Sequence, residues 1–346
     1  MTSCCERCRC CSRYATVLRH LQRSQHEVMQ HGACLGLGCA AMATGDEGVY
    51  NAVREVLFQE SAVKGEGAAL GMGMLLAGRG AAWVCPGMDD PAATELLAQA
   101  HDTSHEKTIR GIALALAMMS YGLESDADML IEQLRNDKDA VLRYGGMYAI
   151  GLAYVGTGNN DAIRKLLHVA VSDVSDDVRR AATTCLGFVL CRQGREVPTL
   201  VRQLTESYNA HVRYGAAMAM GLSCAGTGYT EAVGLLEHML DDPVDFVRQA
   251  ALLSLGLVLQ QEAEEHLPKV KQIRERLAKT AGDKHMSTMT KMGAILAQGI
   301  IDMGGRNCVS TMTSRAGNVR MAAVLGFTLW LQYWYWFPLM HFLSLA

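Results

Sequence analysis

The sequence predicts an all-α fold in which helical hairpins stack side by side as a repeat array, or α-solenoid. Segments rich in Gly, Ala, Leu and Met recur along the 346 residues. Aromatic residues make up 6% and prolines number six, which suits closely packed helices better than a β-sandwich. A recurrence every 30 to 45 residues or so is typical of helical-repeat proteins. The net charge of −3 gives no reason to expect nucleic acid or an anionic membrane as the main partner.

Six of the small-residue segments begin with a basic residue, which serves as an anchor for comparing the repeats. Successive anchors lie 33 to 36 residues apart until the last interval of 43, and they are Arg110, Arg143, Arg179, Arg213, Arg248 and Lys291. Two earlier copies start at His31 and Glu66, so the sequence contains eight copies. An insert over residues 81–91 interrupts the spacing.

Each copy is expected to form two helices. In the copy anchored at Arg143, the small-residue helix opens near Asp139 and ends at Gly156-Thr157-Gly158, where glycine suits a left-handed cap. Asn160 and Asp161 are the candidate N-caps of the second helix. That helix carries an i, i+3, i+4, i+7 apolar stripe made of Ile163, Leu166, Leu167 and Ala170.

Glycines inside the small-residue helices need a physical reason, because a helical glycine costs about 1 kcal/mol relative to alanine. Close approach of neighbouring helices offsets that cost. The structural repeat positions predicted on this basis are Gly36, Gly38, Gly71, Gly73, Gly151, Gly221 and Gly256. If the inner row of helices is thinner than the outer row, the stack curves, and we expect a closed toroid.

The anchor arginines Arg143, Arg179, Arg213 and Arg248 have two interpretations. The favoured one is an Asp–Arg ladder between neighbouring hairpins, in which Asp139, Asp177 and Asp245 supply the carboxylates. The other is a row of basic side chains that binds a partner.

The twelve cysteines do not suggest a disulfide framework. Cys34, Cys39, Cys185, Cys191 and Cys224 sit singly in apolar helical segments, which favours a reducing compartment, the cytoplasm or nucleus. Five more form an N-terminal cluster, Cys4, Cys5, Cys8, Cys10 and Cys11. Cys5 and Cys8 have zinc-knuckle spacing, but no second pair follows at standard distance, so we expect a disordered leader over residues 1–25 and no metal.

Other patterns suggest chemistry only weakly. Gly36-Leu-Gly38 and Gly156-Thr157-Gly158 echo a dinucleotide fingerprint but lie between helices rather than after a strand. His101 and His105 are four residues apart, yet the intervening residues read as a turn. The uncharged run 324–346 could be a membrane span, but Pro338 interrupts it and its aromatics resemble a buried strand. We therefore expect no catalytic, cofactor-binding or metal residues and no membrane contact.

At this level of detail the sequence resembles the proteasome/cyclosome repeat family. The resemblance is carried by HGACLGLGCAAM from His31, RYGGMYAIGLAYVGTG from Arg143, RYGAAMAMGLSCAGTG from Arg213, KMGAILAQGI from Lys291 and the terminal WFPLMHFLSLA. The runs look specifically like those of the larger repeat subunit in the base of the 26S proteasome regulatory particle. It implies a HEAT-like repeat region over residues 26–305 and a partly β segment over 306–346.

The resemblance also implies a non-catalytic scaffold without cofactors. Its expected partners are the proteasomal ATPase ring, lid subunits, ubiquitin receptors and a deubiquitinase. The alternatives within the family are the subunit that docks ubiquitin-like shuttles and a scaffold of the anaphase-promoting complex. Relative to the family, the sequence has no counterpart of the long N-terminal rod or of the receptor-docking tail, so we expect a fragment or a reduced paralogue.

Overall fold

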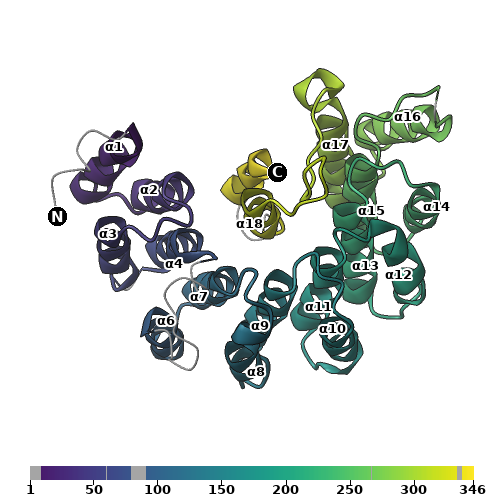
Figure 1. Ribbon diagram of the computed structural model, residues 1–346. Coiled ribbons are helices and arrows are strands. Elements are labelled where there is room, and N and C mark those ends of the chain that lie inside the picture. Colours follow the sequence, from purple (N-terminus) through teal and green to yellow (C-terminus); the bar gives the residue numbers. More distant parts are fainter. Residues whose placement is uncertain (1–8, 60, 79–90, 266, 333–336) are drawn as a thin grey trace. The chain divides into compact units, whose positions relative to one another are not determined.

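The computed structural model describes residues 9–59, 61–78, 91–265, 267–332 and 337–346. The chain divides into two compact units, Met1–Ala153 and Tyr154–Ala346, and each is described here by itself. Both units are built from helical hairpins, drawn in Figure 1. The predicted insert 81–91 falls almost wholly outside the described residues.

In the first unit, small-residue inner helices stack on one another, and an amphipathic outer helix packs on each of them. The inner helices are α2 (Glu27–Ala40), α4 (Ala62–Leu76), α7 (Glu106–Met119) and α9 (Ala140–Ala153). The outer helices are α1 (Arg9–Arg23), α3 (Glu47–Leu57), α6 (Pro91–Asp102) and α8 (Asp128–Arg135). A short 3-10 turn, η1 (Glu124–Ala127), precedes α8.

The second unit repeats this arrangement. Its inner helices are α11 (Asp176–Val189), α13 (Ala210–Ser223), α15 (Asp245–Val258) and α17 (Thr288–Asp302). Its outer helices are α10 (Asn160–Ser172), α12 (Val197–Thr205), α14 (Thr230–Met239) and α16 (Lys269–Gly282). The 3-10 turns η2 (Gly194–Glu196) and η3 (Met303–Arg306) lie before α12 and after α17.

The inner and outer helices differ in how much of their surface is buried. Residues 250–260, most of α15 and its C-terminal end, are all buried, as expected for an inner helix covered on several sides. The outer helix α10 buries Ile163, Leu166 and Ala170 but exposes Asp161 and Arg164. An outer helix packs mainly on the inner helix that follows it in the chain, as α12 does on α13 and α14 does on α15.

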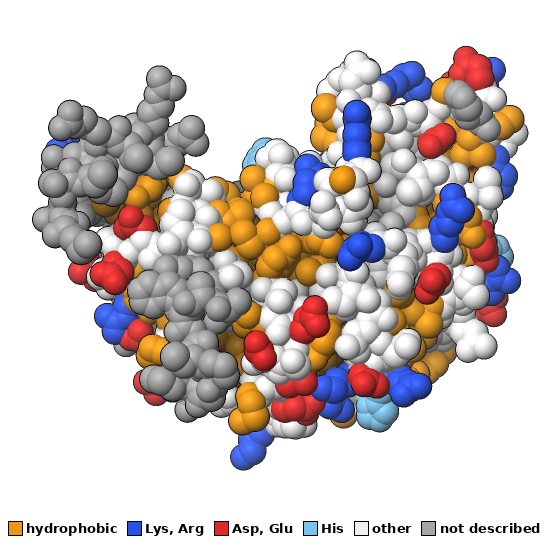
Figure 2. All heavy atoms as spheres, in the orientation of Figure 1, with side chains coloured by type: hydrophobic (Ala, Val, Ile, Leu, Met, Phe, Trp, Pro, Cys, Tyr) orange, Lys and Arg blue, Asp and Glu red, His pale blue; other side chains and the backbone are white. Residues whose placement is uncertain are grey.

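Charged side chains stabilise the outer row of the second unit. Arg202 on α12 pairs with Glu231 on α14 at 2.6 Å, and Lys269 on α16 pairs with Glu237 on α14 at 2.6 Å. Figure 2 shows basic and acidic side chains interspersed along the edge where these outer helices lie. Exposed ion pairs of this kind each contribute about 0–1 kcal/mol to stability. They therefore hold neighbouring outer helices in place but do not drive folding.

The expected disordered leader is wrong over Arg9–Arg23, which form α1. This segment is amphipathic: Leu21 is buried, and the Tyr14 hydroxyl donates to Asp46 at 2.8 Å. An apolar stripe packed on α2 therefore outweighs the polar composition. Cys4, Cys5 and Cys8 lie outside the described residues, as do the side chains of Cys10 and Cys11.

The expected β structure over 306–346 is not supported. Among the described residues of this segment the only extended pairing is one isolated bridge between Thr313 and Val319. Instead the chain forms α18 (Met321–Trp330) and the 3-10 segment η4 (Phe337–Leu345), which pack together. Because α18 is apolar on every side, its sequence carries no periodicity that distinguishes a buried helix from a buried strand. None of the described helices has the length and apolar character needed to cross a bilayer.

Candidate functional site

The junctions between inner helices are the most regular feature of the molecule. Two small residues six positions apart mark each inner helix, as Gly215 and Gly221 do on α13. A Cβ added at Gly215 would lie 2.8 Å from the Arg180 carbonyl oxygen of the preceding inner helix. A Cβ added at Gly221 would lie 2.8 Å from Ser254 Cα of the following one. The first position therefore receives the preceding helix, and the second receives the following helix.

Five of the predicted glycines contact a neighbouring inner helix. An added Cβ would lie 2.6 to 3.0 Å from its nearest neighbour there at Gly38, Gly71, Gly73, Gly221 and Gly256. At Gly71 that neighbour is the Cys34 carbonyl oxygen, a backbone atom inside α2. At the first four of these positions the contacts are closer than real Cβ atoms allow, so a side chain requires a shift, whereas at Gly256 the contact is tight but within the range that Cβ atoms occupy.

The other two predicted glycines differ. At Gly36 an added Cβ would meet only Val17 Cγ1 of the outer helix α1, at an ordinary 3.8 Å. Gly151 is buried in α9. The role of all seven glycines in setting the stack stays a prediction.

The anchor arginines clamp the turn that joins an outer helix to its inner helix. Nη1 of Arg213 donates to the carbonyl oxygens of Ser207 at 2.7 Å and Tyr208 at 3.1 Å, which lie six and five residues before it. Nη1 of Arg248 donates in the same way to Asp242 and Pro243. Arg143 repeats the pattern with Asp137 and Lys138, and Arg179 donates to the Asp173 carbonyl. These charge-assisted bonds satisfy carbonyls near the ends of the outer helices.

The three carboxylates named for the predicted Asp–Arg ladder make other contacts in the structure, and the ladder itself stays a prediction. Asp139 accepts a hydrogen bond from the backbone N–H of Val141, and Asp177 lies 3.0 Å from Arg180 rather than Arg179. Asp245 accepts from the backbone N–H of Phe246.

An ion pair that does link neighbouring hairpins joins Arg213 to Asp242. Nε and Nη2 of Arg213 donate to the two carboxylate oxygens at 2.7 and 3.0 Å. Asp242 precedes the anchor Arg248 by six residues, so it lies in the turn that the next arginine clamps. The two arginines thus connect successive turns.

The Gly-Thr-Gly loops join neighbouring inner helices through backbone hydrogen bonds. Gly226 and Gly228 both have positive φ, and their N–H groups donate to the carbonyls of Leu257 at 2.8 Å and Val258 at 3.0 Å. Gly156 and Gly158 donate likewise to Phe188 and Val189. The acceptors are carbonyls at the end of the next inner helix, which have no partner within their own helix. The glycines are therefore structural and do not cradle a phosphate.

The predicted N-caps after this loop are displaced by one residue. Asn159, rather than Asn160 or Asp161, caps α10, and its side chain accepts from the N–H groups of Asp161 and Ala162.

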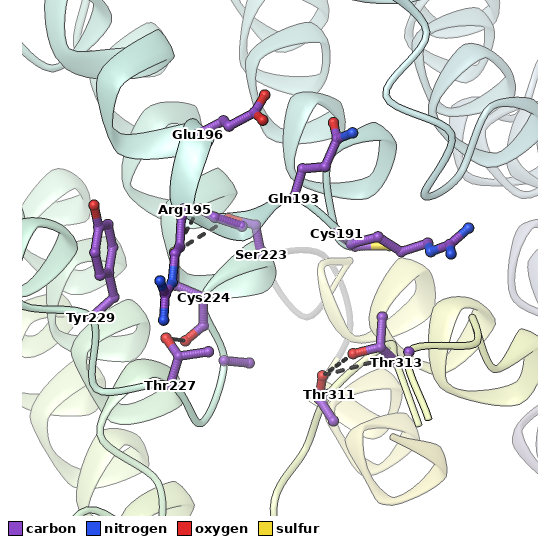
Figure 3. A pocket seen from close by; sticks show the side chains of 14 residues that line it. Cys191, Gln193, Arg195, Glu196, Ser223, Cys224, Thr227, Tyr229, Thr311 and Thr313 are labelled. Atoms are coloured by element: carbon purple, nitrogen blue, oxygen red, sulfur yellow. Dashed lines mark hydrogen bonds between the residues drawn. The ribbon is translucent and has the colours of Figure 1, made fainter. Parts of the chain in front are cut away.

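A groove of about 500 Å³ lies in the second unit, between the ends of two inner helices and the segment after α17. Figure 3 shows Arg195 near Thr227 and Tyr229 on one side and Thr311 and Thr313 on another. Hydroxyl, amide and guanidinium side chains line the groove together with the thiols of Cys191 and Cys224. The Ser223 hydroxyl donates to the Ala219 carbonyl at 2.8 Å, and burial raises the pKa of the Cys191 thiol to about 12.

The buried thiols should therefore be inert. Burial also raises the pKa of Cys34 to about 12, whereas Cys308 is exposed. Because the thiolate is the nucleophile, we expect iodoacetamide at pH 8 to modify Cys34 and Cys191 at least about 100-fold more slowly than Cys308. Site-resolved mass spectrometry measures the three rates. Equal rates in the native protein would contradict this, and equal rates in guanidinium chloride serve as the control.

The histidine pair shows no sign of a metal site. His101 lies in the last turn of α6, 3.4 Å from Asp137, while His105 is the N-cap residue of α7. Across the part of the chain that the structure describes, no three His, Cys, Asp or Glu side chains are grouped to hold an ion.

The stacked hairpins with paired small residues define an α-helical repeat protein of the HEAT type. Consistent with this, the family model for HEAT repeats matches residues 163–256, from within α10 to near the end of α15.

Within that class, the chain is a homologue of 26S proteasome non-ATPase regulatory subunit 1, which is called Rpn2 in yeasts. Homolog B of this subunit from Arabidopsis thaliana is 53% identical over 326 residues, 94% of this chain and 32% of the relative. The Drosophila melanogaster subunit is 49% identical over 95% of this chain and 32% of its own length. Rpn2 of Schizosaccharomyces pombe is 42% identical over 94% and 33%. The chain thus spans about a third of the length of these relatives, and the resemblance found in the sequence is confirmed.

Proposed function

We propose that this chain is a scaffold segment of the 26S proteasome regulatory particle and supports ubiquitin-dependent protein degradation. The supporting observation is identity of 42 to 53% along about 94% of the chain to subunits named as proteasome regulatory subunits. Stacked hairpins suit this role because they present extended helical surfaces rather than one enclosed site.

The proposed role is non-catalytic. The relatives are named non-ATPase subunits. The groove of the second unit carries hydroxyls and guanidinium groups that suit hydrogen bonding to a partner, while its thiol Cys191 has a raised pKa. Docking needs such a surface, and hydrolysis needs an activated nucleophile.

The proposed partners are the proteasomal ATPase ring and lid subunits, together with ubiquitin receptors and a deubiquitinase. The proposed location is the cytoplasm and nucleus, where single buried cysteines remain reduced. A scaffold of the anaphase-promoting complex, or the subunit that docks ubiquitin-like shuttles, is the alternative within the same repeat family.

Affinity purification of the tagged chain followed by mass spectrometry tests the proposal. We expect proteasomal ATPase and lid subunits to be recovered in similar amounts. Gly71→Leu, which overpacks an inner junction, should lose them, whereas Gly234→Leu on the exposed face of α14 should retain them. Recovery of anaphase-promoting-complex subunits instead would favour the alternative, and recovery of neither group would contradict the proposal.

A further inference from the structure

The groove of the second unit has walls that are held in place by the residues around it. The loop 191–196 forms one wall, and the Cys224 thiol donates to the Gly194 carbonyl oxygen of this loop at 3.1 Å. A Cβ added at Gly194 would collide with the carbonyl oxygen of Ser223, so the loop lies directly on the end of α13. The loop is therefore fixed to the helix that forms the neighbouring wall.

Another wall contains Thr311 and Thr313, and it is fixed on both sides. Before it, the Ser310 N–H donates to the buried Gln260 side chain at 2.7 Å. After it, the Arg320 guanidinium donates to the carbonyl oxygen of Thr311 at 2.6 Å. A site whose walls are already ordered loses little conformational entropy when a ligand binds.

Two arginines give the groove a positive charge that equivalent loops lack. Arg192 and Arg195 lie in the loop that follows α11 and line the groove. The loops 154–159, 224–229 and 259–265 follow inner helices in the same way and contain no Lys or Arg. Among the described residues, neither of the two guanidinium groups has a hydrogen-bond or ion-pair partner. Their donors are therefore available to a ligand.

Two acidic residues of this region do not neutralise Arg195. Glu231 accepts a hydrogen bond from the Tyr229 hydroxyl at 2.9 Å and pairs with Arg202 at 2.6 Å. Figure 3 shows that the side chains of Arg195 and Glu196 extend in opposite directions. The guanidinium of Arg195 thus lines the groove without a counter-charge from either residue.

Threonine hydroxyls supply further donors on the other side of the groove from Arg195 (Figure 3). The Oγ1 atoms of Thr311 and Thr313 lie 3.3 Å apart, and one hydroxyl hydrogen is enough for that contact. The second hydroxyl hydrogen stays available. By contrast, the Thr227 hydroxyl already donates to the Cys224 carbonyl oxygen at 2.7 Å. A guanidinium and a hydroxyl on two walls suit the two oxygens of a carboxylate, which only accept hydrogen bonds.

We infer that this groove binds a carboxylate of an acidic peptide segment from a partner protein, which pairs with Arg195 and accepts a hydrogen bond from Thr311 or Thr313. Arg192 and Arg195 together with Glu196 give the lining one net positive charge, which one carboxylate neutralises. The groove volume of about 500 Å³ lies within the range of ~300–1,000 Å³ that is typical of ligand sites. The inference rests on the proposed function only in taking the ligand to be part of a protein.

Fluorescence anisotropy of a labelled peptide, with two adjacent glutamates in an alanine sequence, tests the inference on the purified chain. The same peptide with glutamines should bind about tenfold or more weakly, because it lacks the charge. Arg195→Gln should weaken binding of the glutamate peptide by about tenfold or more. Arg164→Gln is the matched control, because it removes the same charge from an 81% exposed side chain of α10 outside the groove. This variant should bind the peptide as the wild type does.

A second variant and a stability check keep the outcome clear. Thr311→Val combined with Thr313→Val removes both hydroxyls at nearly constant volume and should also weaken binding. Arg195→Gln should melt at the wild-type temperature by circular dichroism, because Arg195 has no partner among the described residues.

Several results would overturn the inference. They are equal affinity of the Arg195 and Arg164 variants, equal affinity for the two peptides, or no binding at about 1 mM peptide. A phosphoserine peptide that binds about tenfold more tightly than the glutamate peptide would assign the groove to phosphate instead. Recovery of proteasomal subunits with a chain that does not bind the glutamate peptide would overturn this inference alone and leave the proposed function standing.

Discussion

Gly71→Leu is expected to lower the free energy of unfolding by about 3 kcal/mol or more, because overpacking a filled junction already costs ~1–3 kcal/mol for small additions. A Cβ at this position would lie 2.6 Å from the carbonyl oxygen of Cys34 and 3.1 Å from its carbonyl carbon. Both are backbone atoms within α2, so no side-chain rotation relieves the clash. The α2 and α4 helices would have to separate along their shared junction. Chemical denaturation monitored by circular dichroism measures the loss.

The matched control is Gly234→Leu on the exposed face of α14, where an added side chain meets no atom within 4 Å. There leucine should be neutral or stabilise the helix by up to about 0.8 kcal/mol through its better propensity. Equal unfolding free energies for the two variants would show that the α2–α4 junction tolerates a side chain.

Arg213→Met is expected to destabilise the protein by about 3 kcal/mol, at the lower end of the range for breaking a buried ion pair. The Arg213 side chain is 12% exposed and the Asp242 side chain 9% exposed. Methionine removes two bonds to that carboxylate and two to the carbonyls of Ser207 and Tyr208. Asp242 would retain its bond from the Val244 N–H but lose its buried counter-charge. The midpoint of urea unfolding reports the change.

Arg202→Met is the corresponding control, because it removes the same charge from a pair whose side chains are 57% and 32% exposed. Water screens that pair, so we expect a loss of only about 0–1 kcal/mol. If the Arg202 and Arg213 variants lost equal stability, the proposed link between successive turns would be wrong.

The helical repeat could be predicted from the sequence because the small residues that let helices approach closely are visible as residue types. Side-chain-poor segments at near-constant spacing indicate helices that approach closely, and five of the seven predicted glycines lie against a neighbouring inner helix. The Gly-Thr-Gly loops were predictable as helix ends, since Gly156, Gly158, Gly226 and Gly228 all have positive φ. The family resemblance succeeded because loops as well as periodic positions matched.

The partners of the polar groups could not be predicted in the same way. The anchor arginines bind backbone carbonyls. Every residue has a carbonyl, so the residue types do not show which one accepts the hydrogen bond. Their fixed position six residues after the turn was the available signal, but nearby carboxylates offered a more familiar explanation. The hydrogen bonds from the Gly-Thr-Gly loop to the carbonyls of Leu257 and Val258 could not be predicted from the sequence for the same reason.

The ends of the chain resisted prediction because pattern and environment conflict there. The polar composition around α1 concealed one apolar stripe, which packs on α2. The uniform hydrophobicity of α18 removed the periodicity that separates helix from strand. Closure into a toroid stays a prediction.

The central claim, that glycine is required where inner helices meet, is tested most directly by the sign of glycine-to-alanine effects on the free energy of unfolding. At Gly38, Gly71 and Gly73, whose added Cβ would lie 2.6 to 2.7 Å from a neighbour, alanine should cost about 1–3 kcal/mol. At Gly32 and Gly234, where nothing lies within 4 Å, alanine should stabilise by about 0.5–1 kcal/mol. Opposite signs for the two groups support the account, and stabilisation at both would contradict it.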